Sequence, residues 1–127
     1  MRELKNLAET VRKTLKLKYD EQSVKFIEEF IEKNKNSFEK EEWDGIINGL
    51  GCFIGQCIIN NFGGQWEVEK ETGSVAVRFS DNNKAYPLTK VSKQFHNGLE
   101  DSVTSFYRHV PILFNVRKKP WWKFWTV

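Results

Sequence analysis

The sequence has few of the residues that build cross-links and no long apolar run. It contains two cysteines, Cys52 and Cys57, both in the apolar run "LGCFIGQCIINNF". A helix would turn two such side chains about 140° apart, which makes a local disulfide awkward. No run approaches the roughly 20 apolar residues of a membrane span. The N-terminal residues carry charges throughout, unlike a secretory signal. We therefore expect a cytoplasmic domain with no disulfide.

Histidine is equally scarce, which limits metal and catalytic sites. His96 and His109 are the two histidines, and with the cysteines their spacing matches no usual zinc site. A cysteine of this run acting as nucleophile, with either histidine as base, remains an alternative. A cysteine on an apolar helix face has a raised pKa, however, and is inert. We expect no metal, no cofactor and no catalytic residue.

Signals for phosphate or nucleic-acid binding are also missing. The stretch "GLGCFIG" at residues 49–55 has the wrong glycine spacing for a dinucleotide turn, and no strand is predicted before it. Cations do not alternate with aromatic residues along a predicted strand, as an RNA-binding sheet would require. We expect no nucleic-acid partner.

Three stretches of helical spacing fill the first half of the chain. Leu4 to Leu15 forms one apolar stripe, and a second helix follows the N-cap residue Asp20 to about Asn34. The third is predicted to begin at Asn36 with a capping-box-like spacing to Glu39 and to run to the Gly63–Gly64 pair. The sequence thus predicts three N-terminal helices.

The second half changes period. Residues 65–79 alternate as a hairpin that turns near Thr72 and Gly73, and residues 85–88 are predicted as a third strand, with Pro87 at an edge or bulge. Residues 99–110 have helical spacing until Pro111. We therefore predict an α+β domain over residues 1–116, with a small three-stranded antiparallel sheet and one or two short C-terminal helices.

The predicted third helix packs on this sheet over residues 45–61. It contains four glycines that each cost roughly 1 kcal/mol in a helix, which indicates close approach of another backbone. The predicted core comprises Ile46, Leu50, Phe53, Ile54, Ile58, Trp66, Val77, Phe79, Phe106 and Tyr107.

Two segments together carry a family resemblance. The stretch "LGCFIGQCIINNFGGQWEVE" followed by "YPLTKVSKQFHNGLEDSVTSFYRHV" resembles a family of small bacterial domains of unknown function. In that family a Gly-rich helix ending in Gly-Gly-x-Trp precedes a short sheet and a Glu-Asp-Ser, Phe-Tyr segment. The resemblance covers about residues 45–110. It implies a bacterial source and a compact fold, and it implies no reaction.

Charge is concentrated at the two ends of the chain. Residues 1–18 hold six Lys or Arg and two Glu, and residues 116–127 hold four and no acid, so each end carries +4 within a total of +3. The remaining residues therefore carry −5. Basic ends on an acidic body indicate contact with an anionic partner through the ends.

The end of the chain, residues 117–127, combines these cations with aromatic residues. As a strand it would place aromatic side chains on both faces, and its own domain can cover only one of them. Three destinations stay open: a protein groove, a membrane interface reinforced by the basic first helix, or the domain's own core. The predicted binding residues are Arg117, Lys118, Lys119, Trp121, Trp122, Lys123, Phe124 and Trp125.

These observations predict a non-catalytic bacterial protein-binding domain, such as an adaptor or an immunity protein that neutralises a toxin, with an aromatic attachment tail. One alternative is a peripheral protein anchored on an anionic membrane surface. The other is the Cys/His-dependent enzyme.

Overall fold

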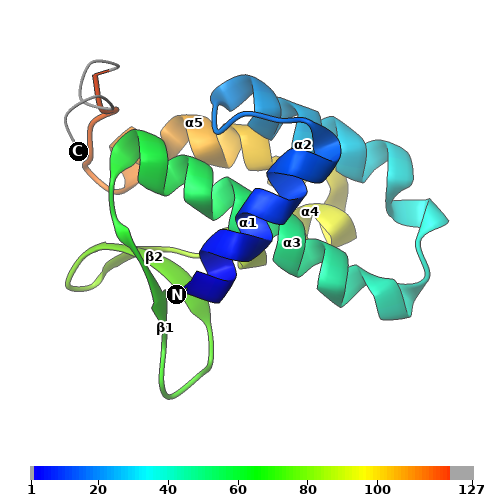
Figure 1. The fold of residues 1–127 in the computed structure, drawn as a ribbon, viewed down its shortest axis with the longest axis horizontal. Coiled ribbons are helices and arrows are strands. Elements are labelled where there is room, and N and C mark those ends of the chain that lie inside the picture. The colour runs from blue at the N-terminus through cyan, green and yellow to red at the C-terminus, as the bar shows by residue number, and fades with distance from the viewer. Residues whose placement is uncertain (1, 121–127) are drawn as a thin grey trace.

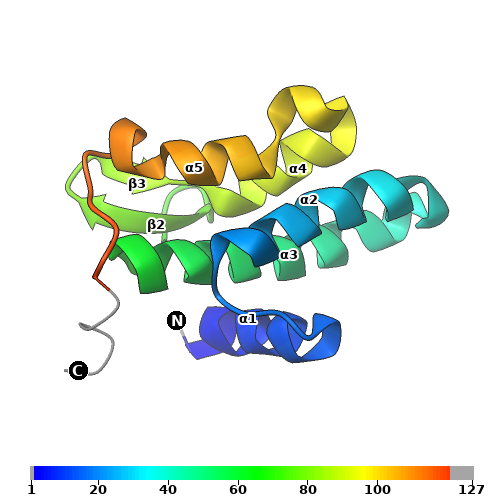
Figure 2. The ribbon, with the colours of Figure 1, turned by 90° about the horizontal axis from the view of Figure 1, so that it is seen from above.

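A computed structural model describes residues 2–120 and has a long helix at its centre (Figures 1 and 2). This helix, α3 (Lys40–Phe62), packs against α1 (Arg2–Leu15) and α4 (Pro87–Asn97). Figure 2 shows α1 on one side of α3, and α4 and α5 (Val103–Leu113) on the other. The remaining helix, α2 (Glu21–Asn34), packs mainly on α5. The α+β fold with three N-terminal helices is confirmed.

The helix boundaries follow from local caps. The Oδ1 atom of Asp20 accepts the Ser23 amide at 2.8 Å, which starts α2 as predicted. The capping box of α3 lies between Glu39 and Glu42, because residues 35–37 form a separate short 3-10 helix. The predicted start at Asn36 was therefore wrong by several residues. Gly63, at φ 92°, ends α3 as expected.

The sheet is antiparallel in the order β1 (Gln65–Val68), β2 (Val75–Ser80), β3 (Asn83–Ala85). Trp66 pairs with Val77, which pairs with Ala85, so the three share the face that packs on the core. The predicted third strand exists, but it spans Asn83–Ala85 and not residues 85–88. Pro87 instead occupies the first turn of α4, where its fixed φ suits a helix and its missing N–H costs nothing.

The predicted core is confirmed. Of the ten residues expected there, seven are buried in one cluster, and Ile46, Trp66 and Phe79 are half-buried against it.

Two 3-10 turns, η1 (Lys35–Ser37) and η2 (Gly98–Asp101), complete the structure. Over residues 2–120, none of the helices is both long and apolar enough to cross a bilayer.

Candidate binding surfaces

The C-terminal end of α5 exposes large apolar side chains. The helix begins at Ser102, whose side chain accepts the Ser105 amide, and it buries Val103, Thr104, Phe106, Tyr107 and Val110. The helix does not stop at Pro111 but continues to Leu113. Beyond the buried stripe, Ile112 is 80% exposed and Leu113 is 59% exposed. A single exposed apolar side chain is common, but two adjacent ones at this level are not. We call Ile112 and Leu113 together the apolar step.

The residues that follow are held against the domain. The ring of Phe114 packs 5.2 Å from that of Phe79, and its carbonyl accepts the Asn83 side-chain amide at 2.8 Å. The Lys119 amide then donates to the Asn61 carbonyl at 2.6 Å, next to the end of α3. Residues 114–119 therefore cross from the end of α5 to the end of α3.

This arrangement brings part of the predicted site together. Arg117, Lys118 and Lys119 are all exposed at the end of the molecule where α3 and α5 both end (Figures 1 and 2). The other predicted binding residues, Trp121, Trp122, Lys123, Phe124 and Trp125, lie outside the described residues. Sequence reasoning missed Ile112 and Leu113. The sequence did hold a signal for this exposure, because Ile112 is an apolar residue outside the buried helical stripe that ends at Val110.

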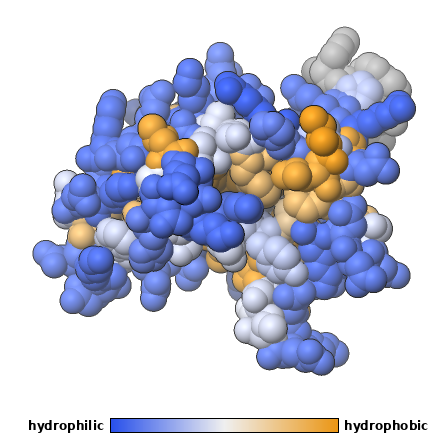
Figure 3. All heavy atoms as spheres, turned by 180° about the vertical axis from the view of Figure 1, so that it is seen from behind, coloured by the Kyte–Doolittle hydropathy of each residue, from blue (hydrophilic) through white to orange (hydrophobic). Residues whose placement is uncertain are grey.

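A hollow of about 330 Å³ lies beside this step, between α4, η2 and α5. On the face shown in Figure 3, apolar surface gathers near one end and continues into a recess with apolar atoms at its floor. The Nζ atom of Lys90 lies 5.4 Å from the centre of the Phe106 ring. The hollow is lined by Lys90, Glu100, Asp101, Ser102, Ser105, Phe106, His109 and Leu113. It thus combines an apolar floor with charges of both signs at its rim.

A buried polar network fixes the wall of this hollow. Gln94 of α4 is fully buried, and its side-chain oxygen accepts the Val103 amide at 3.0 Å. Its side-chain nitrogen donates to the Glu28 carbonyl and to the Glu32 carboxylate. The Ser102 hydroxyl donates to the Glu28 carboxylate. Because these bonds join α2, α4 and the start of α5, the corner that carries the hollow is held in one arrangement.

The histidines do not meet the cysteines in a catalytic pair. The His96 ring packs at a tilt against Trp43, with ring centres 5.3 Å apart, and the Nδ1 atom of His109 lies 2.7 Å from the Ser105 carbonyl oxygen. Cys52 and Cys57 are both buried in α3. Burial raises the pKa of the Cys52 thiol to about 11, and burial also raises the pKa of the Cys57 thiol above its ordinary range. Neither thiol is activated as a nucleophile.

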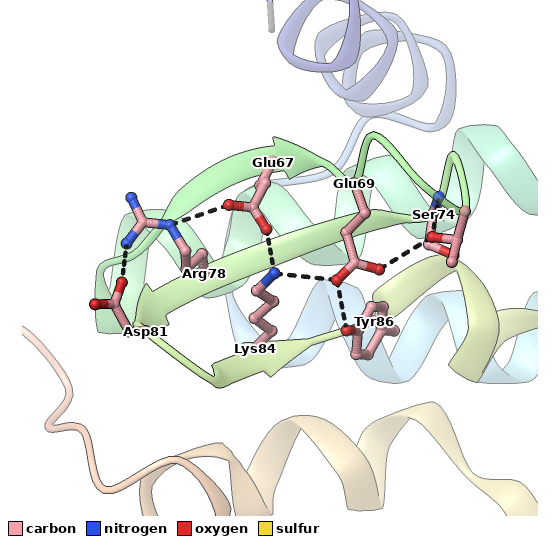
Figure 4. Close-up of polar contacts among 8 residues, drawn as sticks. Glu67, Glu69, Ser74, Arg78, Asp81, Lys84 and Tyr86 are labelled. Atoms are coloured by element: carbon pink, nitrogen blue, oxygen red, sulfur yellow. Dashed lines mark hydrogen bonds and ion pairs between the residues drawn. The ribbon is translucent and has the colours of Figure 1, made fainter.

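The outer face of the sheet carries an ion-pair network (Figure 4). Lys84 lies between two carboxylates, with Nζ 2.5 Å from Glu67 and 3.0 Å from Glu69. Tyr86 donates to Glu69, and Arg78 pairs with Glu67 at 3.3 Å. The hydrogen bond from Lys84 lowers the pKa of Glu69, and the two carboxylates raise the pKa of Lys84. The charges of this network are therefore paired with one another.

A second polar cluster attaches α1 to the loop that follows it. Glu9 accepts hydrogen bonds from Arg12 and from the Tyr19 hydroxyl, at 2.9 and 2.8 Å. These two donors lower the pKa of Glu9 to about 2.

Across residues 2–120, no group of three His, Cys, Asp or Glu side chains is placed to hold a metal ion.

Comparison with known proteins identifies no family for this chain. No protein-family model, no curated protein and no solved structure matches the chain significantly. The resemblance to small bacterial domains therefore stays a prediction.

Proposed function

We propose that this chain is a non-catalytic protein-binding domain, of the adaptor or immunity type, that contacts its partner through the face formed by α4, η2 and α5. The observation that carries the proposal is the hollow on this face, where Phe106 and Leu113 form an apolar floor beside exposed charges. Leu99, on the η2 turn, is also 60% exposed. Exposed apolar surface rimmed by polar residues is typical of protein interaction sites.

The chemistry of the hollow indicates the kind of partner segment that fits. An apolar side chain of the partner would lie on Phe106 and Leu113 and displace water from both. Fully burying such a side chain contributes roughly 1.5 to 3 kcal/mol. Lys90 on one wall, and Glu100 and Asp101 on the other, would fix the orientation of polar groups beside it. A buried anchor within a charged rim is the usual arrangement at the centre of a protein interface.

The state of the titratable groups argues against catalysis in the described residues. The thiols are buried with raised pKa values, and the network on the sheet pairs its charges internally. The described part of the chain thus offers binding surface more readily than an activated nucleophile.

A pull-down with a matched pair of variants tests the proposal. Ser105 is exposed and lines the hollow, so Ser105→Arg fills the hollow without changing the core. Ser37 is exposed on η1 and does not line the hollow, so Ser37→Arg makes the same chemical change as a control. We expect tagged wild type and the Ser37→Arg variant to recover a partner from the source cell in stoichiometric amount, and the Ser105→Arg variant to lose it.

Two outcomes would overturn this function. One is equal recovery by both variants, which would place the partner elsewhere on the domain. The other is the absence of any stoichiometric partner together with turnover of a substrate by the purified protein. Unfolding curves of both variants should match the wild type, so that loss of binding is not loss of fold.

A further inference from the structure

The end of the molecule where α3 and α5 stop carries a second surface, which shares Leu113 with the hollow. Ile112 and Leu113 occupy the last turn of α5, and both are mostly exposed. The crossing segment then presents Arg117, Lys118 and Lys119, all exposed, at the same end (Figures 1 and 2). The surface thus combines an apolar step with a row of cations.

The segment that forms this surface carries charge of one sign. Within residues 2–120, none of the three cations forms an ion pair with a carboxylate. The sequence from Ile112 to Val127 contains four Lys or Arg and no Asp or Glu. The carbonyl ends of α3 and α5 lie here too, and cations beside helix C-termini are favoured. Three neighbouring unpaired cations attract a partner surface of extended negative charge.

We propose that this surface attaches the protein to an anionic lipid bilayer, with Ile112 and Leu113 at the headgroup boundary and Arg117, Lys118 and Lys119 against anionic headgroups. A bilayer fits better than an acidic protein because it offers negative charge and apolar depth together over a wide area. The sequence beyond Pro120 adds three tryptophans and a phenylalanine. Tryptophan is the residue most typical of membrane interfaces.

The contact is interfacial, and it needs several weak elements acting together. Over residues 2–120 no helix can cross a bilayer, so the contact is with the surface. A single weak signal gives only marginal, reversible attachment, whereas apolar and cationic contacts reinforce each other. This attachment goes beyond the proposed protein-binding function and does not depend on it. A protein that held both contacts would recruit its partner to the membrane surface.

Vesicle co-sedimentation of the full chain tests the attachment. The probes are vesicles of phosphatidylcholine with phosphatidylglycerol, and vesicles of phosphatidylcholine alone. We expect binding to the first and little to the second. We also expect binding to weaken as salt is raised toward about 1 M, where charges are screened beyond about 3 Å.

Matched variants separate the apolar and the cationic contributions. Replacing Ile112 and Leu113 by Ser should weaken binding to anionic vesicles about tenfold or more. The control is Val68→Ser, which removes an exposed valine from β1, away from the C-terminal end of α5, and should leave vesicle binding unchanged. Replacing Lys118 and Lys119 by Gln should weaken binding and flatten its salt dependence, while Lys33→Gln on α2 should not.

Several results would contradict the attachment. One is failure of the full chain to bind anionic vesicles, and another is binding that survives the Ile112 and Leu113 replacements. If vesicles are ignored but Ile112→Ser alone abolishes capture of a protein partner, the surface is a protein interface and not a membrane contact, because Ile112 does not line the hollow. The Ser105→Arg variant should still bind vesicles like wild type, so failure of the protein-binding function is recognised separately.

Discussion

Replacing Gly55 by Ala should destabilise the domain although alanine favours a helix. Gly55 lies in α3 under the indole of Trp66, and a Cβ atom placed there would lie 2.1 Å from the Trp66 Cη2 atom. Ordinary contact begins at 3.4 Å, so the ring must move by about 1.3 Å. The ring is not free to do so, because its Nε1–H donates to the buried Gln56 side chain at 3.0 Å.

The magnitude is best measured against Gly45→Ala in the same helix. A Cβ atom at Gly45 meets nothing within 4 Å, so this change should stabilise by up to about 1 kcal/mol through helix propensity alone. Both variants share that gain. The difference between them therefore isolates the overpacking cost at Gly55, which we expect to be about 1 to 3 kcal/mol.

Urea unfolding followed by circular dichroism measures both free energies, and equal m-values would show that the two transitions are comparable. Removing the ring should relieve the cost, so Gly55→Ala should be less destabilising in a Trp66→Leu background. If Gly55→Ala is as stable as Gly45→Ala, the indole does not rest on Gly55, and the packing of the sheet on α3 described above is wrong.

Three further outcomes follow from the polar and thiol groups. Gln94→Leu should lower the free energy of unfolding by about 1 to 3 kcal/mol, because the buried Val103 amide loses its acceptor. The control Gln22→Leu, at an exposed position, should lower it by less than about 0.5 kcal/mol. Equal losses in urea unfolding would contradict the network. The folded-state pKa of Glu9 is lowered from 4.5 to about 2, so its contribution to stability is present above pH 4.5 and is lost as pH falls toward 2. The Glu9→Gln variant should therefore be less stable than wild type near neutral pH and should approach wild-type stability in acid. A stability difference that stays constant with pH would refute this. Neither cysteine should react with iodoacetamide at neutral pH until denaturant is added, and rapid labelling of Cys52 in the folded protein would revive the enzyme alternative.

Local signals predicted much of the fold. Asp20 specifies the start of α2 because its carboxylate satisfies a free amide, and the glycines after Phe62 end α3. The close approach expected at the glycines of α3 is real at Gly51, where an added Cβ would lie 2.7 Å from the Leu88 Cα atom. At Gly55 the neighbour is a side chain, and at Gly45 there is none. Composition alone does not distinguish these three environments.

The prolines misled the prediction of the last helices. The sequence pattern predicts a strand at Pro87, but proline is equally suited to the first turn of a helix, and no side-chain cap marks that start. Pro111 removes one hydrogen bond but leaves the helix intact to Leu113, since the Phe114 amide still reaches the Val110 carbonyl. The sequence therefore did not predict the exposed end of α5.

The candidate surfaces were predictable only in part. The cations at residues 117–119 are evident from composition. The hollow is not, because it forms where α4 and α5 meet through Gln94, and Gln94 lies outside the helix predicted over residues 99–110. Contacts of this kind depend on the tertiary arrangement and leave no periodic signal.

Hydrogen exchange on the domain, alone and with its captured protein partner, tests the central claim most directly. Because the partner is proposed to cover the α4, η2 and α5 face, amides in residues 98–113 should become more protected in the complex. Amides of β1, on the sheet, should exchange as before. Protection confined to β1, or no change at residues 98–113, would contradict the proposed binding face.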